Sequence, residues 1–126
     1  MPNIQLHVGG VPEHFNVPWW EAHAHGEFNK LGIEVIWHEC AGGTGQMVDA
    51  LSNHELDLAI SLTEGTVAAI NQAAPISLVQ WYVSSPLLWG IHVAANSDFQ
   101  TIDQLQQARV AISRPGSGSH LMSYVE

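Results

Sequence analysis

The sequence predicts an α/β domain in which a mostly parallel sheet is flanked by helices. Short apolar runs typical of strands alternate along the chain with segments whose apolar residues recur at helical spacing. Glycine-rich turns separate these segments and fall where strands end and helices begin. No internal repeat or low-complexity tract interrupts the order.

Composition narrows the classes of function. The 126 residues suit one domain with a hydrophobic core, and 46% of them are hydrophobic. A net charge of −9 with only 3 basic residues argues against nucleic acid and anionic membranes as partners. Cys40 is the single cysteine, which excludes an internal disulfide and a cysteine-clustered metal site. No apolar run approaches the roughly 20 residues that span a bilayer, so membrane insertion is not expected.

The first part of the chain reads as repeated strand and helix units. Ile4, Leu6 and Val8 alternate as in a strand, and Pro18 fits the first turn of a helix that Gly32 ends with a left-handed cap. The further expected elements are a strand over 33–37, a helix after the turn 40–45, a central strand over 58–60, a helix over 67–73 and a strand over 76–83.

The pattern changes after Pro86. Residues 87–95 read as a long strand, Thr101 to Gln104 as a capping box that starts a short helix, and 109–113 as another strand. A glycine-serine turn follows, and 120–125 resemble the first turns of a helix. We therefore divide the chain into a first α/β lobe, residues 1–85, and a crossover strand with the incomplete beginning of a second lobe, residues 86–126.

Four turns are expected at the carboxyl ends of strands, where open α/β sheets bind ligands. Glycines there let the backbone approach a ligand, and N–H groups at a helix start favour an acceptor group. Any fold of this class needs such turns, so each one alone is more simply a connection. Their shared edge is what favours binding. The turns are residues 9–16, 41–45, 63–66 and 113–119.

Two kinds of side chain near this edge have open interpretations. Glu64 can accept hydrogen bonds from an amine or an amino-pyrimidine, or it can stabilise a helix N-terminus, and the sequence does not separate the two roles. Trp19 and Trp89 are candidates to line a cleft and stack on a flat ligand, whereas the other tryptophans are expected to serve packing.

No catalytic, cofactor or metal motif is present. The segment 42–45 lacks the Lys-Ser/Thr of a phosphate-binding loop and the glycine spacing of a dinucleotide site. The segment 116–120 does not match the G-x-S-x-G pattern of a nucleophile elbow. Eight histidines occur without a metal-binding spacing, which favours scattered structural or solvated histidines. We therefore expect no enzyme activity, no cofactor and no metal.

Six segments taken together resemble the ABC-transporter substrate-binding proteins of the thiamine-pyrimidine, sulfonate and nitrate type. The resemblance covers essentially the whole chain and implies a type II periplasmic-binding-protein-like fold, with two lobes that close on a solute by hinge motion. It rests on residues 8–16, 42–45, 57–60, 63–65, 85–93 and 112–122.

The resemblance also implies a site and partners. With Trp89 from the reasoning above, the expected ligand-binding residues are Gly10, Glu13, His14, Gly43, Thr44, Thr63, Glu64, Ser113, Ser117, Ser119 and His120. The implied partners are a small-molecule solute and an ABC transporter permease. The resemblance points to the periplasm, but the N-terminal residues show no signal-peptide pattern, so a cytoplasmic location stays open.

Two alternatives accompany the solute-binding prediction. The same fold hosts a fungal branch that makes the thiamine pyrimidine at a cysteine-rich iron site, and the single Cys40 argues against that enzyme. The other alternative is a truncated oligomeric module without transport function. Exposed apolar side chains at Leu87, Trp89, Ile91 and Val110 would then favour a homo-oligomer, for example a dimer that swaps the C-terminal segment.

Overall fold

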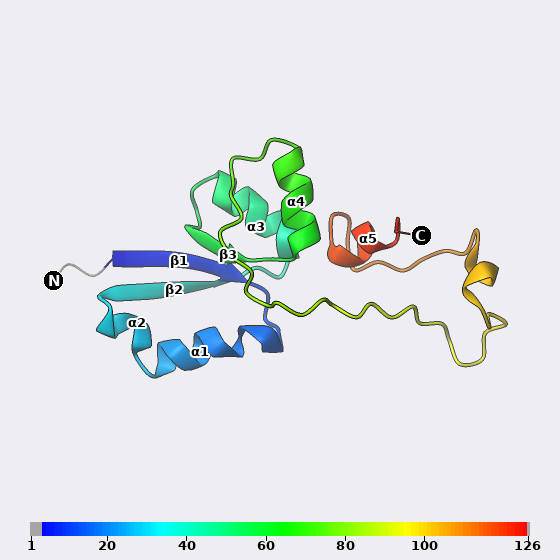
Figure 1. The fold of residues 1–126 in the computed structure, drawn as a ribbon, viewed down its shortest axis with the longest axis horizontal. Coiled ribbons are helices and arrows are strands. Elements are labelled where there is room, and N and C mark those ends of the chain that lie inside the picture. Colours follow the sequence, from blue (N-terminus) through cyan, green and yellow to red (C-terminus); the bar gives the residue numbers. More distant parts are fainter. Residues whose placement is uncertain (1–3, 126) are drawn as a thin grey trace.

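The computed structural model describes residues 4–125 and has a small parallel sheet at its centre (Figure 1). Its strands are β1 (Ile4–Gly10), β2 (Ile33–Glu39) and β3 (Leu58–Ile60), in the order β2-β1-β3. Gly10 lies opposite both Glu39 and Ile60, so the carboxyl ends of all three strands meet at one edge of the sheet. We call this edge the carboxyl edge. The predicted parallel α/β architecture is confirmed.

Helices cover both faces of the sheet (Figure 1). On one face lie α1 (Val17–Ala24) and α2 (Glu27–Lys30), which follow a short 3-10 turn, η1 (His14–Asn16). On the other face lie α3 (Gly43–Ser52) and α4 (Thr63–Asn71). The α3 face holds a buried cluster of Cys40, Met47 and Leu56.

The helix predicted from Pro18 to Gly32 is broken into α1 and α2, so this prediction was wrong in one detail. Gly26 has φ of +67°, a left-handed conformation that cannot continue a right-handed helix. Gly32, with φ of +73°, adopts the left-handed conformation that the sequence predicts for the end of the helix. Pro18 lies in the first turn of α1, as expected.

The strand over 58–60 was predicted to be central, and it is instead an edge strand of the described sheet. β1 takes the central place because it pairs with β2 on one side and β3 on the other. The apolar run at 58–60 is covered by α3 on one face and is only half-buried.

Three further predicted strands, 76–83, 87–95 and 109–113, are not strands in the described chain. Their β-branched and aromatic residues favour extended backbone, and the backbone is extended, but no other segment pairs with it. A strand needs a hydrogen-bonded neighbour, which composition alone does not supply. In Figure 1 the chain beyond residue 76 leaves the sheet as a long trace, and the orange stretch that includes residues 109–113 returns toward α5.

The end of the chain returns to the carboxyl edge. The predicted helix start at Thr101 is confirmed by η2 (Ile102–Leu105), a 3-10 turn in which the Gln104 side chain accepts a hydrogen bond from the Thr101 N–H at 3.2 Å. The final helix, α5 (Gly118–Met122), packs against α4. No helix of residues 4–125 is long and apolar enough to cross a membrane.

Candidate ligand-binding site

The first turns of α3 and α4 are joined at the carboxyl edge by Thr44. This side chain is buried, and its Oγ1 accepts a hydrogen bond from the Leu62 N–H at 3.3 Å. Its methyl group lies against Gly65, where a Cβ would be 2.7 Å away. Thr44 therefore fixes the position of α4 relative to α3, and its hydroxyl is already used within the protein.

Gly43 brings the backbone of the same turn close to a cation. It has φ of +69°, and a Cβ at this position would collide with the guanidinium of Arg114. The Nε of Arg114 donates a hydrogen bond to the Gly42 carbonyl. The close approach that glycine permits here is made by Arg114, a residue that sequence reasoning did not single out.

Glu64 is the most distinctive group of the edge. It lies in the first turn of α4, where a negative charge is favourable, and its Oε1 is buried without a hydrogen-bond partner among the described residues. This oxygen faces Gly118 of α5, whose added Cβ would be 2.8 Å from it and 3.2 Å from the Trp89 ring. A buried carboxylate oxygen without a donor is costly, and the cost is relieved when a donor arrives.

The polar loop of residues 113–120 reaches this carboxylate through Gly118. We call it the serine loop. Ser117 is buried, and its Oγ accepts a hydrogen bond from the His120 N–H at 3.2 Å, which caps α5. Ser119 Oγ accepts from the Ser113 N–H at 3.0 Å and lies 3.0 Å from Ser117 Oγ. These hydroxyls hold the loop together as it stands.

His120 completes the serine loop. Its Nδ1 accepts a hydrogen bond from the Gly116 N–H at 3.0 Å. The ring nitrogen that accepts a hydrogen bond carries no proton, so Nε2 is the N–H of the ring. It donates a hydrogen bond to the Tyr124 hydroxyl, 3.1 Å away. His120 is therefore oriented at both nitrogens, and its ring is half-buried beside α5.

The turn after β1 is a packing site in this structure. Gly10 is buried, and a Cβ there would be 2.6 Å from the Trp37 ring and 3.0 Å from Asn16 Nδ2. Asn16 is fully buried, donates from Nδ2 to the Val11 carbonyl at 2.7 Å, and has an Oδ1 without a partner among the described residues. Its burial was not foreseen from the sequence, because asparagine before a helix normally signals an exposed cap.

The remaining predicted residues are more open. Glu13 and His14 are exposed beside η1, and Thr63 is exposed at the start of α4. Trp89 reaches Gly118 and thus lies beside Glu64. Trp19 packs among aromatic rings, since it stacks on Phe28 at a centroid distance of 5.3 Å and meets Trp37 at 6.3 Å.

The residues gathered by the fold are thus a subset of those expected. Gly118 and the Trp89 ring lie beside the Glu64 carboxylate, Ser117 precedes Gly118 in the chain, and Thr44 packs against the neighbouring Gly65. Gly10, Glu13 and His14 belong to a separate part of the same edge, beside Trp37 and Asn16.

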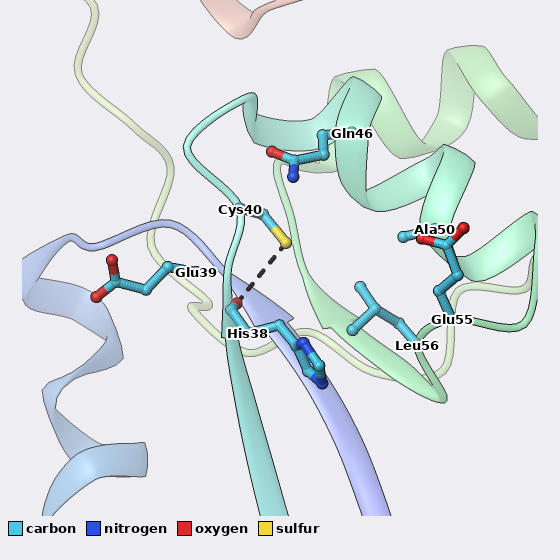
Figure 2. Close-up of a pocket in the computed structure, with 7 residues that line it drawn as sticks. All are labelled: His38, Glu39, Cys40, Gln46, Ala50, Glu55 and Leu56. Atoms are coloured by element: carbon cyan, nitrogen blue, oxygen red, sulfur yellow. Dashed lines mark hydrogen bonds between the residues drawn. The ribbon is translucent and has the colours of Figure 1, made fainter.

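A hollow of about 230 Å³ lies elsewhere, on the α3 face of the sheet (Figure 2). None of the predicted site residues lines it. In Figure 2 the Cys40 sulfur points toward Leu56, and the Glu39 side chain points away from the other lining residues. Burial raises the pKa of the Cys40 thiol, and a hydrogen bond with the Gly10 backbone lowers it less. The lining residues are His38, Glu39, Cys40, Gln46, Ala50, Glu55 and Leu56.

Comparison with solved structures identifies the fold. The chain is 35% identical to a Candida albicans protein, the CA3427 gene product, and superposes on it with a TM-score of 0.85. That protein is described as defining a new family with the generic periplasmic binding protein fold. This chain has the periplasmic binding protein fold. The match covers 94% of this chain and 39% of the Candida albicans protein, so the chain spans about two fifths of the length of that periplasmic-binding-protein-like relative.

The other comparisons add no further assignment. No protein-family model matches the sequence, and no curated protein matches it. The predicted fold class is therefore confirmed, while the thiamine-pyrimidine, sulfonate and nitrate group remains a resemblance of sequence segments.

Proposed function

We propose that the chain is a solute-binding protein, or the solute-binding part of one, and that its ligand binds between the carboxyl edge and the serine loop. The observation that carries this proposal is the buried Glu64 Oε1, which has no donor among the described residues. It lies where two segments distant in sequence meet, since Gly118 and Trp89 reach it from beyond the first lobe. A ligand between such segments would be enclosed when the two segments close on it by hinge motion, without a chemical reaction.

The carboxylate defines the ligand's chemistry. An acceptor-only oxygen in a desolvated place favours an N–H donor, such as an amine or an amino-heterocycle. The Trp89 ring beside it offers a flat apolar surface for a heterocycle. The net charge of −9 adds a field that disfavours small anions. Among the ligands that the resemblance suggests, an amino-pyrimidine therefore suits this site better than a sulfonate or nitrate.

The proposal extends to the biological setting. By resemblance, the solute would be delivered to an ABC transporter permease, and the chain itself would carry out no reaction. Cys40 is the single cysteine and packs under α3 with Met47 and Leu56. One cysteine cannot form the cysteine-rich iron site of the pyrimidine-forming branch.

Isothermal titration calorimetry with cytosine as the amino-pyrimidine probe, and methanesulfonate as the anion, tests the proposal. Cytosine should bind measurably and methanesulfonate should not. The variant Glu64→Gln should weaken cytosine binding by about tenfold or more, because it removes a charged acceptor. The matched control Glu55→Gln changes an exposed carboxylate at the α3 hollow and should leave binding unchanged.

Two results would overturn the proposal. The first is the absence of heat and of thermal stabilisation with cytosine at millimolar concentration. The second is equal weakening by both variants, which would assign the effect to the overall charge of the chain rather than to Glu64.

A further inference from the structure

Two histidines that are distant in the sequence meet on the α3 face of the sheet. His7 lies in the central strand β1 and His38 in β2, and 31 positions separate them along the chain. In the parallel register His7 pairs with Ile36, and residues two apart on a strand share a face, so His38 lies on the same face as His7. His7 Nδ1 and His38 Nε2 are 2.8 Å apart, which is hydrogen-bond distance. The spacing of the histidines along the chain does not reveal this pair.

The backbone that carries the pair is held on both sides. β1 and β2 pair along their whole length, residues 4–10 with residues 33–39. From the other side of β1, Asp57 makes two hydrogen bonds with residue 7. Its Oδ2 accepts from the His7 N–H at 2.8 Å, and its own N–H donates to the His7 carbonyl at 2.9 Å. Side chains on such strands are positioned more precisely than side chains on loops, so the pair is in place before any ligand arrives.

The separation of the two ring nitrogens suits one coordination geometry. Two nitrogens bonded to the same ion at about 2.0 Å are about 2.8 Å apart when the angle at the ion is 90°, and about 3.3 Å apart at the tetrahedral angle of zinc sites. The observed 2.8 Å matches the 90° arrangement. Neighbouring ligands at 90° are typical of tetragonal Cu²⁺ and Ni²⁺, and the same ligands hold Cu²⁺ more tightly.

The surroundings of the pair suit a small cation. His38 lines the hollow of about 230 Å³ on the α3 face, together with the Glu55 carboxylate, and both histidines are half-buried rather than enclosed. The net charge of −9 favours the approach of a cation. Within residues 4–125 no three His, Cys, Asp or Glu side chains are gathered that could hold a metal ion, so the pair supplies two ligands and water completes the set.

We propose that His7 Nδ1 and His38 Nε2 bind one Cu²⁺ ion in neighbouring positions of a tetragonal site. In the metal-free pair one of these nitrogens donates a hydrogen bond and the other accepts it. Both nitrogens need a free lone pair to bind the ion, so the donating ring moves its proton to its other nitrogen, and a neutral pair releases no proton. The inference is independent of the proposed solute site, because it rests on neither Glu64 nor the serine loop.

Pulsed electron paramagnetic resonance of the chain with equimolar Cu²⁺ tests the ligand set, because it counts the coordinated imidazoles. We expect a tetragonal spectrum with two imidazoles. His7→Gln and His38→Gln should each reduce the count to at most one. The matched control His25→Gln replaces an exposed histidine and should keep both. A single imidazole in the parent chain, or two in either of the first two variants, would overturn the proposal.

Calorimetric titration with Cu²⁺, with glycine as a competing chelator, measures the affinity. His7→Gln and His38→Gln should each weaken binding by about tenfold or more, whereas His25→Gln should leave it unchanged. Free thiol is counted before and after the titration, so that reduction of copper by Cys40 is not taken for binding. Equal affinities in all three variants would contradict the assignment of the site to the pair.

Nuclear magnetic resonance supplies a readout that needs no substitution. Paramagnetic Cu²⁺ added to the ¹⁵N-labelled chain at well below one equivalent broadens signals close to the ion. We expect the amide signals of residues 7 and 38 and the ring signals of these two histidines to broaden first. Broadening centred instead on the exposed His23 and His25, with residues 7 and 38 unaffected, would overturn the proposal.

Discussion

Replacing Gly10 with alanine separates a packing role from a ligand-binding role at the carboxyl edge. Gly10 ends the central strand β1. An added Cβ would lie 2.6 Å from two atoms of the Trp37 ring and 3.0 Å from Asn16 Nδ2. The ring cannot move freely, because Trp20 meets it edge-on at a centroid distance of 6.2 Å.

The expected size of the effect follows from overpacking. Inserting a methyl group into a packed interior costs about 1 to 3 kcal/mol in the free energy of unfolding. For a chain of this length, that corresponds to a fall of about 4 to 12 °C in the melting temperature. A glycine that served only to admit a ligand would have no such effect on the ligand-free protein.

Thermal and urea unfolding followed by circular dichroism measures the loss. Gly45→Ala is the matched control, because an added Cβ there meets nothing within 4 Å and lies within helix α3. Alanine is the better helix former, so this variant should gain about 0.5 to 1 kcal/mol. If Gly10→Ala unfolds at the same temperature as the parent protein, the packing role assigned to Gly10 is refuted.

Three other perturbations have defined outcomes. Burial raises the pKa of the Cys40 thiol above its ordinary value, so thiol labelling at pH 8 should be at least about tenfold slower in the native protein than in urea, and equal rates would contradict this. Partial burial of the Tyr82 hydroxyl raises its pKa above the ordinary value of about 10. The stability that the protonated hydroxyl provides at the Phe15 carbonyl should therefore be present below that ordinary value and be lost as pH rises through the higher folded-state pKa. Tyr82→Phe should remove the late component of the phenolate absorbance titration; an unchanged titration would refute the assignment. Thr44→Val leaves the Leu62 N–H without its acceptor and should cost about 1 kcal/mol in urea unfolding, whereas Thr44→Ser should cost less.

The elements with local signals were predictable from the sequence. β1 follows from alternation ending at two glycines, and the end of α2 from the left-handed Gly32. The strand predictions that were wrong, such as 76–83, rested on local composition alone. They contained nothing about a neighbouring segment to pair with. A run of β-branched and aromatic residues specifies extended backbone, but pairing depends on the positions of segments far away in the sequence.

The candidate site was predictable only in part, for a related reason. The proximity of Glu64 to the serine loop could be expected, because both follow positions where strands were expected to end. The burial of Asn16 and the use of Gly43 by Arg114 could not, since each depends on which side chain from a distant segment fills the space. No pattern in the sequence marks those contacts.

The central claim is that a donor-bearing solute binds at the Glu64 carboxylate. The most direct measurement is a titration of the ¹⁵N-labelled chain with cytosine, followed by amide chemical shifts. We expect the largest shifts at Thr44, Glu64 and Gly118, where the carboxyl edge meets α5. Shifts centred on Ala50 and Leu56 at the α3 hollow, or no shifts at saturating cytosine, would contradict the claim.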